Sequence, residues 1–548
     1  MSDSRLQGLW TGLLLLFVSA GAILPTATTA IHFVDAGIEA GITLVTWHGR
    51  SDKPHLLESG GAGAALLDYD LDGDLDLYVV NGWRLDGVEV VDRGGNALYQ
   101  NTGGGAFVDV TAATGVGDRG WGTAVAVGDI EGDGDPDLFV TNFGRDVLYR
   151  NIGGRFEAVE SDAGIDGWSS SSVFFDGDGD GDEDLFVTGY IEATLEEVLQ
   201  AEVGLRWKNT EVMRGPFGFE GLANRYFTND GSGHFSDATD VAGLDDPGLF
   251  YSFGVAATDL DADGLVDLYV ANDSNPNYLY RNLGGGRFEE VGLWSGAALD
   301  HRGLAQAGMG IATADYDSDG LPDLFVTNFA DDTCTLYRNL GRMAFEDVSA
   351  AVGLVEPTFD PLSWGTVFAD FDLDGDLDLF VANGHIYPQA DAVPDVKTSF
   401  AQSNQVLEYV DGVFREVSAA AGPGLAVRES SRGVAVGDID NDGDLDLVIA
   451  NMDARPTVLR NESSRLGEWM IVDAPAAEAV EVTADGRTWR RQRVRGGSYA
   501  SSSDGRFHFG LGRITGQLDV RVIWPDGAET ELPRVTPGQI ITADQHRE

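Results

Sequence analysis

Seven nine-residue segments of the sequence place carboxylates at positions one, three, five and nine and glycine at position six. The first of them is DYDLDGDLD, residues 68–76. Carboxylates at this spacing repel one another, so a compact loop is stable only if a hard cation lies among their oxygens. The glycine allows a sharp turn, and the backbone carbonyl at position seven adds a further oxygen. The spacing therefore predicts calcium-binding loops, with up to seven Ca²⁺ per chain.

The predicted metal ligands are the carboxylates at those four positions of each loop. They are Asp68, Asp70, Asp72 and Asp76; Asp129, Glu131, Asp133 and Asp137; Asp176, Asp178, Asp180 and Asp184; Asp259, Asp261, Asp263 and Asp267; Asp315, Asp317, Asp319 and Asp323; Asp370, Asp372, Asp374 and Asp378; and Asp438, Asp440, Asp442 and Asp446. An EF-hand would require a bidentate Glu at position twelve, where these loops have Val or Ile. Each loop is therefore expected to lead into a β-strand and not into a helix.

The residues around each loop predict a four-stranded unit. An apolar run precedes the loop, a DLFVTN-type run follows it, and two more strand-like runs come next with a glycine-rich turn between them. Four antiparallel strands in about fifty residues or more are typical of a propeller blade. Seven loops thus predict seven blades. Residues 32–42 have the fourth-strand pattern without a preceding loop, so we expect them to complete the seventh blade and remove its open edge.

The predicted fold is all-β: a seven-bladed β-propeller with calcium-binding hairpin loops over residues 31–464, followed by a small β-rich domain over residues 465–548. Residues 1–30 are interpreted as a secretory signal peptide, because an apolar run at residues 12–24 is followed by small residues. A retained membrane anchor is the alternative, although the run is shorter than the ~20 apolar residues of a spanning helix. The mature protein is expected to be secreted, extracellular or periplasmic, without membrane insertion.

Two further segments depart from the repeats. An insertion at about residues 190–215 contains a predicted short amphipathic helix, residues 193–207, which either carries function or caps one face of the propeller. A cluster of arginines lies between Arg487 and Arg495, and Arg491, Arg493 and Arg495 alternate as they would on one face of a strand. Such a face suits either an anion or polysaccharide site or docking against the acidic propeller, and charge complementarity favours docking.

The composition argues against several classes of partner. With 90 acidic and 35 basic residues the formal charge is −55, which disfavours nucleic acids and anionic membrane surfaces. A hydrophobic content of 43% argues against disorder, so cation binding is the main explanation for the acidity. The single cysteine, Cys334, cannot form a disulfide within one chain and is expected to be a structural thiol.

The repeats resemble the FG-GAP/VCBS repeats of integrin alpha-like propellers, through strands of the DLDLYVVN type. The chain is also similar to the cartilage acidic protein-like group, through the segments GAGAALLDYDLDGDLDLYVVNG, RGPFGFEGLANRYFTNDG and VANGHIYPQAD. Its C-terminal part resembles an ASPIC/UnbV domain, through RGGSYASSSDGRFHFGLG and VRVIWPDG. An Asn-Arg-Asp, glycine-rich segment usual in that domain is replaced by DAPAAEAVEV, residues 473–482. The resemblance implies an extracellular calcium-binding protein without established enzymatic chemistry.

Three hypotheses about function follow. The first is a non-catalytic interaction or adhesion scaffold for an unknown protein or carbohydrate ligand, since the sequence has neither an HExxH nor a GxSxG motif. The second is a lyase or hydrolase acting on an acidic polysaccharide, with His385 and Tyr387 as the acid–base pair; a structural histidine that orders a turn is the simpler interpretation. The third places the function in the insertion. We assign no catalytic residue and no organic cofactor.

Overall fold

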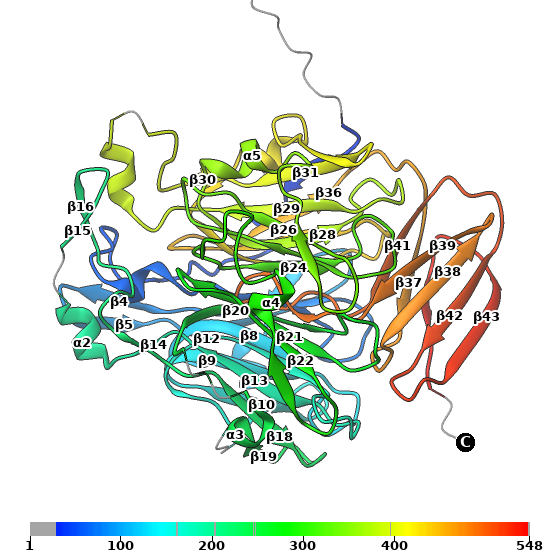
Figure 1. The fold of residues 1–548 in the computed structure, drawn as a ribbon, viewed down its shortest axis with the longest axis horizontal. Coiled ribbons are helices and arrows are strands. Elements are labelled where there is room, and N and C mark those ends of the chain that lie inside the picture. The colour runs from blue at the N-terminus through cyan, green and yellow to red at the C-terminus, as the bar shows by residue number, and fades with distance from the viewer. Residues whose placement is uncertain are drawn as a thin grey trace, which may run out of the picture.

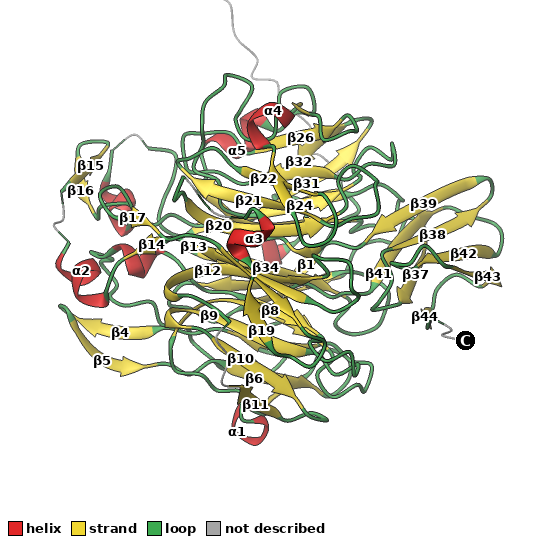
Figure 2. Cartoon of the chain, turned by 60° about the horizontal axis from the view of Figure 1, so that its bottom comes forward, coloured by secondary structure: helices red, strands yellow, loops and turns green. Residues whose placement is uncertain are grey.

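The computed structural model describes residues 29–545 except 160–162, 202, 203, 245, 247 and 395. Most of the predicted signal peptide lies outside these residues. Nearly all regular structure is β, as predicted, and it forms a seven-bladed propeller with a small β domain beside it (Figures 1 and 2). No helix within the described residues has the length and apolar character needed to cross a membrane.

Each blade is a four-stranded antiparallel sheet, and the blades are numbered here in chain order. Blade 1 comprises β2 (Ala64–Leu67), β3 (Asp76–Val79), β6 (Ala97–Asn101) and β7 (Phe107–Asp109); blade 2, β8 (Trp121–Gly128), β9 (Asp137–Arg145), β10 (Val147–Asn151) and β11 (Phe156–Val159); blade 3, β12 (Asp166–Phe175), β13 (Asp184–Gly189), β18 (Arg225–Asn229) and β19 (Phe235–Asp237). Blade 4 comprises β20 (Tyr251–Thr258), β21 (Asp267–Asp273), β22 (Tyr278–Asn282) and β23 (Phe288–Glu290); blade 5, β24 (Ile311–Ala314), β25 (Asp323–Val326), β26 (Thr335–Asn339) and β27 (Phe345–Asp347). Blade 6 comprises β28 (Ser363–Ala369), β29 (Asp378–Asn383), β31 (Gln405–Val410) and β32 (Val413–Glu416).

Blade 7 takes its strands from both ends of the propeller sequence. β34 (Ser431–Gly437), β35 (Asp446–Asn451) and β36 (Thr457–Asn461) are followed in the sheet by β1 (Phe33–Asp35), which pairs antiparallel with β36. Successive first strands contact one another around the ring, so these strands line its axis. β9 also pairs with β12 and joins blades 2 and 3 into one larger sheet. Closure through β1 leaves no blade edge open at the point where the ring begins and ends.

The metal loops and the insertions lie on opposite faces of the propeller. Each predicted metal loop connects the first and second strands of a blade, whereas the insertions connect second and third strands, at the other end of the antiparallel strands. The insertions contain hairpin β4 (Trp83–Asp86) with β5 (Glu89–Arg93), β14 (Ile191–Glu192) with β17 (Glu220–Gly221), α2 (Leu195–Gln200), β15 (Leu205–Trp207) with β16 (Thr210–Val212), η2 (Pro388–Ala392), and β30 (Gln402–Ser403), which pairs with β33 (Arg428–Glu429). Shorter helices are η1 (Leu56–Ser59), α1 (Thr111–Thr114), α3 (Thr239–Ala242), α4 (Gly292–Ser295), α5 (Val355–Phe359) and η3 (Pro423–Ala426).

The helix predicted for residues 193–207 is only partly correct. Thr194 begins α2 by accepting a hydrogen bond from the backbone N–H of Glu197 at 3.3 Å, and the helix ends at Gln200. Residues 205–207 form β15, because the turn at Lys208 and Asn209, both with positive φ, returns the chain into β16.

The C-terminal domain consists of two sheets around one apolar core. Its strands are β37 (Glu468–Asp473), β38 (Ala479–Ala484), β39 (Arg487–Gln492), β40 (Arg495–Gly496), β41 (Phe507–Gly512), β42 (Leu518–Ile523), β43 (Glu529–Val535) and β44 (Ile540–Thr542). One sheet has the order β41-β37-β44 and the other β39-β38-β42-β43. β40 belongs to neither sheet, because it pairs with β20 of blade 4.

Residues 493–504 of this domain run through the axis of the propeller, and we call them the axial segment. Its backbone is hydrogen-bonded to first strands of several blades: Ser498 with Ile311 of blade 5, Ala500 with Val125 of blade 2, and Ser502 with Leu66 of blade 1. Tyr499 is buried between aromatic rings of blades 4 and 6. The centre of the propeller is therefore filled by its own chain.

Candidate metal centres

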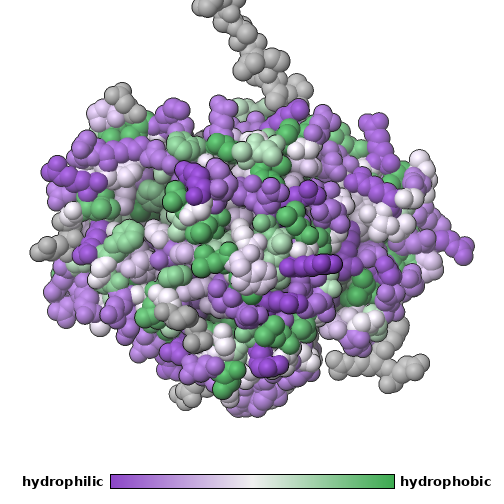
Figure 3. All heavy atoms as spheres, in the orientation of Figure 1, coloured by the Kyte–Doolittle hydropathy of each residue, from purple (hydrophilic) through white to green (hydrophobic). Residues whose placement is uncertain are grey.

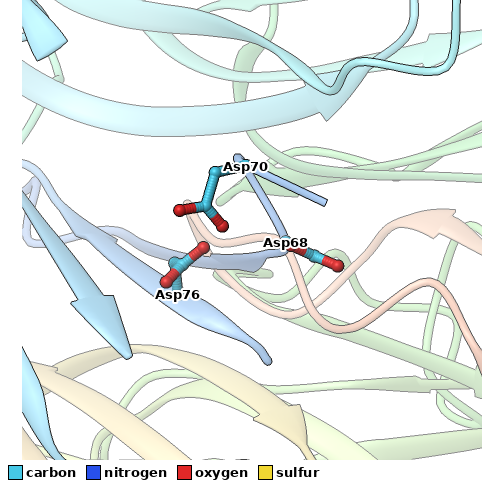
Figure 4. A group of neighbouring side chains, drawn as sticks. All are labelled: Asp68, Asp70 and Asp76. Carbon is cyan, nitrogen blue, oxygen red and sulfur yellow. The ribbon is translucent and has the colours of Figure 1, made fainter. Parts of the chain in front are cut away.

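The first metal loop gathers three carboxylates around one space. Asp68 and Asp70 extend from the loop and Asp76 from the start of β3, and one oxygen of each lies within 4.8 Å of the others (Figure 4). Oδ1 of Asp70 is buried and accepts no hydrogen bond. Three carboxylates with a free buried oxygen form an oxygen donor set of the kind that Ca²⁺ prefers, so the residues fit this ion.

Equivalent clusters recur around the propeller. Carboxylate oxygens also lie within 4.8 Å of one another in four further groups: Asp176, Asp178 and Asp184; Asp259, Asp261 and Asp263; Asp315, Asp317 and Asp323; and Asp370, Asp372 and Asp374. The structure thus brings together predicted ligands from loops 1, 3, 4, 5 and 6. These aspartate clusters have the chemistry to hold a metal ion.

Backbone hydrogen bonds give all seven loops the same shape. In each loop the N–H of the glycine at position six donates to the carboxylate at position one, at 2.8 to 3.1 Å. These glycines have φ between 87° and 98°, where a side chain is strained. The glycine at this position is therefore required by the backbone of the loop.

The aspartate at position nine is the most buried carboxylate of the first loop. Oδ1 of Asp76 accepts from the N–H of Asn101 at 2.7 Å, and Oδ2 accepts from the N–H of Tyr69 at 3.1 Å. Burial nevertheless raises the pKa of Asp76 to about 8, because the loss of water outweighs the two hydrogen bonds. Burial also raises the pKa of Asp267 and of Asp323 to about 8. A bound cation would stabilise the ionised form at these positions.

An asparagine at the end of the third strand ties six of the seven loops to the neighbouring blade. Nδ2 of Asn151, for example, donates to the carbonyl of Tyr69 in the first loop at 2.8 Å. The same bond is made by Asn101, Asn229, Asn282, Asn339 and Asn461. Blade 6 has Tyr409 at this position, and its ring packs edge-on against Tyr316 with centroids 5.6 Å apart. The asparagine bond between blades was not predicted from the sequence, although the asparagine recurs in the repeated LYRN run.

The residue that precedes the asparagine at the end of the third strand gives the loops different electrostatic environments. In blades 2, 4 and 5 it is an arginine that pairs with the carboxylate at position three: Arg150 with Glu131, Arg281 with Asp261 at 2.8 Å, and Arg338 with Asp317 at 2.7 Å. Blades 1, 3 and 6 have Gln100, Thr228 and Glu408 there. An adjacent guanidinium lowers the attraction of a loop for a cation, so the loops are not equivalent sites.

The arginine cluster of the C-terminal domain docks against the propeller, as charge complementarity favoured. Arg487 lies 3.3 Å from Asp376, and Arg495 lies 3.6 Å from Glu183. Arg493 is buried and donates to backbone carbonyls of its own domain. The expectation that Arg491, Arg493 and Arg495 share one strand is wrong, because β39 ends at Gln492 and the chain then enters the axis.

His385 and Tyr387, the pair considered for catalysis, are both buried. Nδ1 of His385 accepts a hydrogen bond from the backbone N–H of Tyr387 at 3.0 Å, which confirms that the histidine orders this turn. Burial lowers the pKa of His385 to about 3, so the imidazole is neutral. Trp207 of the insertion packs on it with ring centroids 4.8 Å apart. These contacts give His385 a structural role beneath the insertion face.

Comparisons with protein families agree with this architecture. An FG-GAP-like repeat model matches residues 68–140, 129–187, 259–326 and 315–381, and an ASPIC and UnbV model matches residues 476–548. The chain is therefore a member of the FG-GAP-like repeat proteins that carry an ASPIC/UnbV domain.

Its curated relatives include cartilage acidic protein 1. The Mus musculus protein is 28% identical over 297 residues, which cover 50% of this chain and 42% of the mouse protein. The Homo sapiens protein is 28% identical over 297 residues, covering 50% of this chain and 41% of the human protein. The match thus spans less than half the length of these relatives.

Solved structures show weaker similarity. An Agrocybe aegerita lectin, described as recognising non-reducing terminal N-acetylglucosamine, is 17% identical with a TM-score of 0.37, over 65% of this chain and 80% of the lectin. BBS1N, crystallised in complex with ARL6DN, is 13% identical with a TM-score of 0.40, over 78% of this chain and 96% of that one. Scores this low carry no inference about ligands.

Proposed function

We propose that this protein is a secreted calcium-binding scaffold, non-catalytic, whose seven loops bind Ca²⁺ and hold a rigid disc that presents a surface to a protein or carbohydrate partner. The observation that carries the proposal is the repeated cluster of carboxylates with a buried, unpartnered oxygen, as at Asp70. The ligands are the carboxylates at positions one, three, five and nine of each loop. A buried charge without a partner is costly, and a divalent cation removes that cost.

The insertion face is the surface we assign to the partner. The opposite face carries the metal loops and the C-terminal domain, and the axis is filled (Figures 1 and 2). Hairpin β4–β5 exposes Val88 and Val91, and the insertion exposes Leu205 and Phe217. Figure 3 views the propeller from the side, with the insertion face at its left edge, and shows a mostly hydrophilic surface with small, separate hydrophobic groups. Scattered apolar residues on a polar surface suit a reversible interaction better than an obligate one.

The test is thermal unfolding of residues 31–548 in excess calcium and in excess chelator, with bound metal counted by mass spectrometry. Because ligands that bind only the folded state stabilise it, we expect a large rise in melting temperature with calcium. A parallel titration with Mg²⁺ is the control, since its preference for rigid octahedral sites predicts a smaller rise. Unchanged melting together with no bound calcium would refute the proposal.

A further inference from the structure

The sixth loop, residues 370–378, lies between the propeller and the C-terminal domain. The backbone N–H of Leu466, in the segment leading into β37, donates to the carbonyl of Asp372 at 2.8 Å. Gly510 of β41 lies so close to the loop that a Cβ there would be under 3.0 Å from Oδ2 of Asp370. The domain therefore covers the loop with its backbone at Gly510 and with the side chains of Arg487 and Trp489 beside Gly375.

Docking buries the carboxylates of this loop more deeply than those of the first loop. Asp370, Asp372 and Asp378 are 1%, 2% and 3% exposed. In the first loop Asp68 and Asp70 are only half-buried. Burying several like charges together is strongly unfavourable unless a counter-charge accompanies them.

The docked domain supplies only part of the counter-charge: the buried guanidinium of Arg491 acts on Asp370, and Arg487 acts on Asp374. Among the described residues, no Lys, Arg or His forms an ion pair with the four predicted ligands of the sixth loop, whereas arginines reach loops 2, 4 and 5. The corresponding third-strand residue is Glu408, which adds a negative charge. Arg487 pairs at 3.3 Å with the side chain of Asp376, at position seven. The sixth loop is thus a buried anionic site covered by a domain.

We infer that Ca²⁺ in the sixth loop fixes the C-terminal domain against the propeller, so that this loop is an interdomain calcium latch. The inference rests on the proposed calcium binding and goes further by giving one loop a distinct role. Without the ion, docking must bury mutually repelling carboxylates. With Ca²⁺ bound, the same docking buries a site that carries two fewer negative charges. The axial segment keeps the domain attached in both states, so calcium controls how firmly it is seated.

Linkage requires the effect to run in both directions. If calcium favours docking, docking must raise the calcium affinity of the sixth loop by the same factor. Couplings of this kind are about 5- to 150-fold, so a change of roughly tenfold is expected. Perturbing the domain side should therefore weaken one calcium site, although no metal ligand has changed.

The first test measures amide hydrogen exchange of the segment 463–467 in the full chain, because the Leu466 amide is bonded to the sixth loop. Calcium should slow exchange there in the wild-type protein. Asp372→Asn, at position three of the sixth loop, should abolish that slowing. Asp70→Asn, at position three of the first loop, is the matched control, because no hydrogen bond or ion pair joins residues 68–76 to the described part of 465–545. The control should retain the slowing.

The second test titrates calcium into a domain-side variant by calorimetry. Gly467→Ala should weaken one calcium site about tenfold by the linkage above, because a Cβ there would lie under 3.0 Å from the carbonyl oxygen of Leu373, which is not a predicted ligand. Gly516→Ala is the control in the same domain, because a Cβ there meets only Asp485 at 3.5 Å. Glu408→Gln changes no predicted ligand or covering residue, and should weaken the same site if Asp372→Asn fails to fold.

The outcomes separate the two proposals. Slowed exchange lost only in Asp372→Asn, with one weakened site in Gly467→Ala, supports the latch. The latch would be overturned if Asp372→Asn retained the slowing, or if both aspartate variants lost it equally. Unchanged calcium affinities in Gly467→Ala would also overturn it. A wild-type protein that binds calcium without slowed exchange at 463–467 refutes the latch alone. A wild-type protein that binds no calcium refutes the proposed function as well.

Discussion

Tyr499 tests whether the axial segment is a packed part of the propeller. Its side chain is 2% exposed, with ring centroids 4.8 Å from Trp364 and 5.7 Å from Phe253. Replacing a large, fully buried aromatic residue by alanine typically costs about 3–5 kcal/mol, because contacts are lost and a cavity remains. The channel is lined by strands of different blades, which limits collapse around the cavity. We therefore expect Tyr499→Ala to lower the free energy of unfolding by about 4 kcal/mol.

Tyr499→Phe separates packing from hydrogen bonding. The Tyr499 hydroxyl accepts a hydrogen bond from the backbone N–H of Gly61, and its loss should cost only about 1 kcal/mol. The assay is urea unfolding of the full chain in excess calcium, followed by tryptophan fluorescence because Trp364 touches the substituted ring. A Tyr499→Ala variant within about 1 kcal/mol of the wild type, or no more destabilised than Tyr499→Phe, would refute axial packing.

Two further predictions concern the glycine that makes room for the axial segment and the protonation of the loops. Gly63→Val should displace this segment and destabilise the protein at least as much as Tyr499→Ala, because a Cβ would lie under 3.0 Å from the carbonyl oxygen of Ala500. The measurement is hydrogen exchange of amides 497–504, which should become faster in the variant. Unchanged exchange would contradict the prediction. In chelator, the melting temperature should fall as pH rises from about 4 to about 8. Burial raises the pKa of Asp76 to about 8 from its ordinary 3.8, so over this pH range the folded state holds a proton that the unfolded state releases. Calcium should remove this fall by replacing the proton, and a melting temperature that rises with pH in chelator would contradict the reasoning.

The fold class could be predicted because its signals are local and repeated. Nine contiguous residues specify each loop, and the glycine at position six adopts the positive φ that the pattern requires. The four-stranded unit follows from strand-like runs within one repeat, and repetition fixes the number of blades. The docking of the arginine cluster followed from charge alone.

Contacts between distant segments could not be predicted in the same way. The axial segment consists mostly of small residues without hydrophobic periodicity, and its place in the channel depends on strands as distant in sequence as β2 of blade 1. The pairing of Arg281 with Asp261, which distinguishes one loop from another, depends on strand register that the loop motif does not encode. The predicted helix over residues 193–207 was cut short because the hairpin turn at Lys208 and Asn209 overrides helical periodicity.

Closure of the ring through β1 has a consequence for the order of folding. The backbone N–H of His32 donates a hydrogen bond to the hydroxyl of Ser463, 431 residues further along the chain. The axial segment, which fills the centre of the ring, is synthesised after Ser463. Contacts this distant in sequence form slowly, and a chain emerging from its N-terminus exposes unpaired strand edges until their partner strands have been made. The propeller therefore reaches its final packing only after the axial segment has been synthesised. In that interval the mutual repulsion of the acidic loops keeps neighbouring chains apart, so the charge that a cation must later balance also protects the unfinished protein from aggregation.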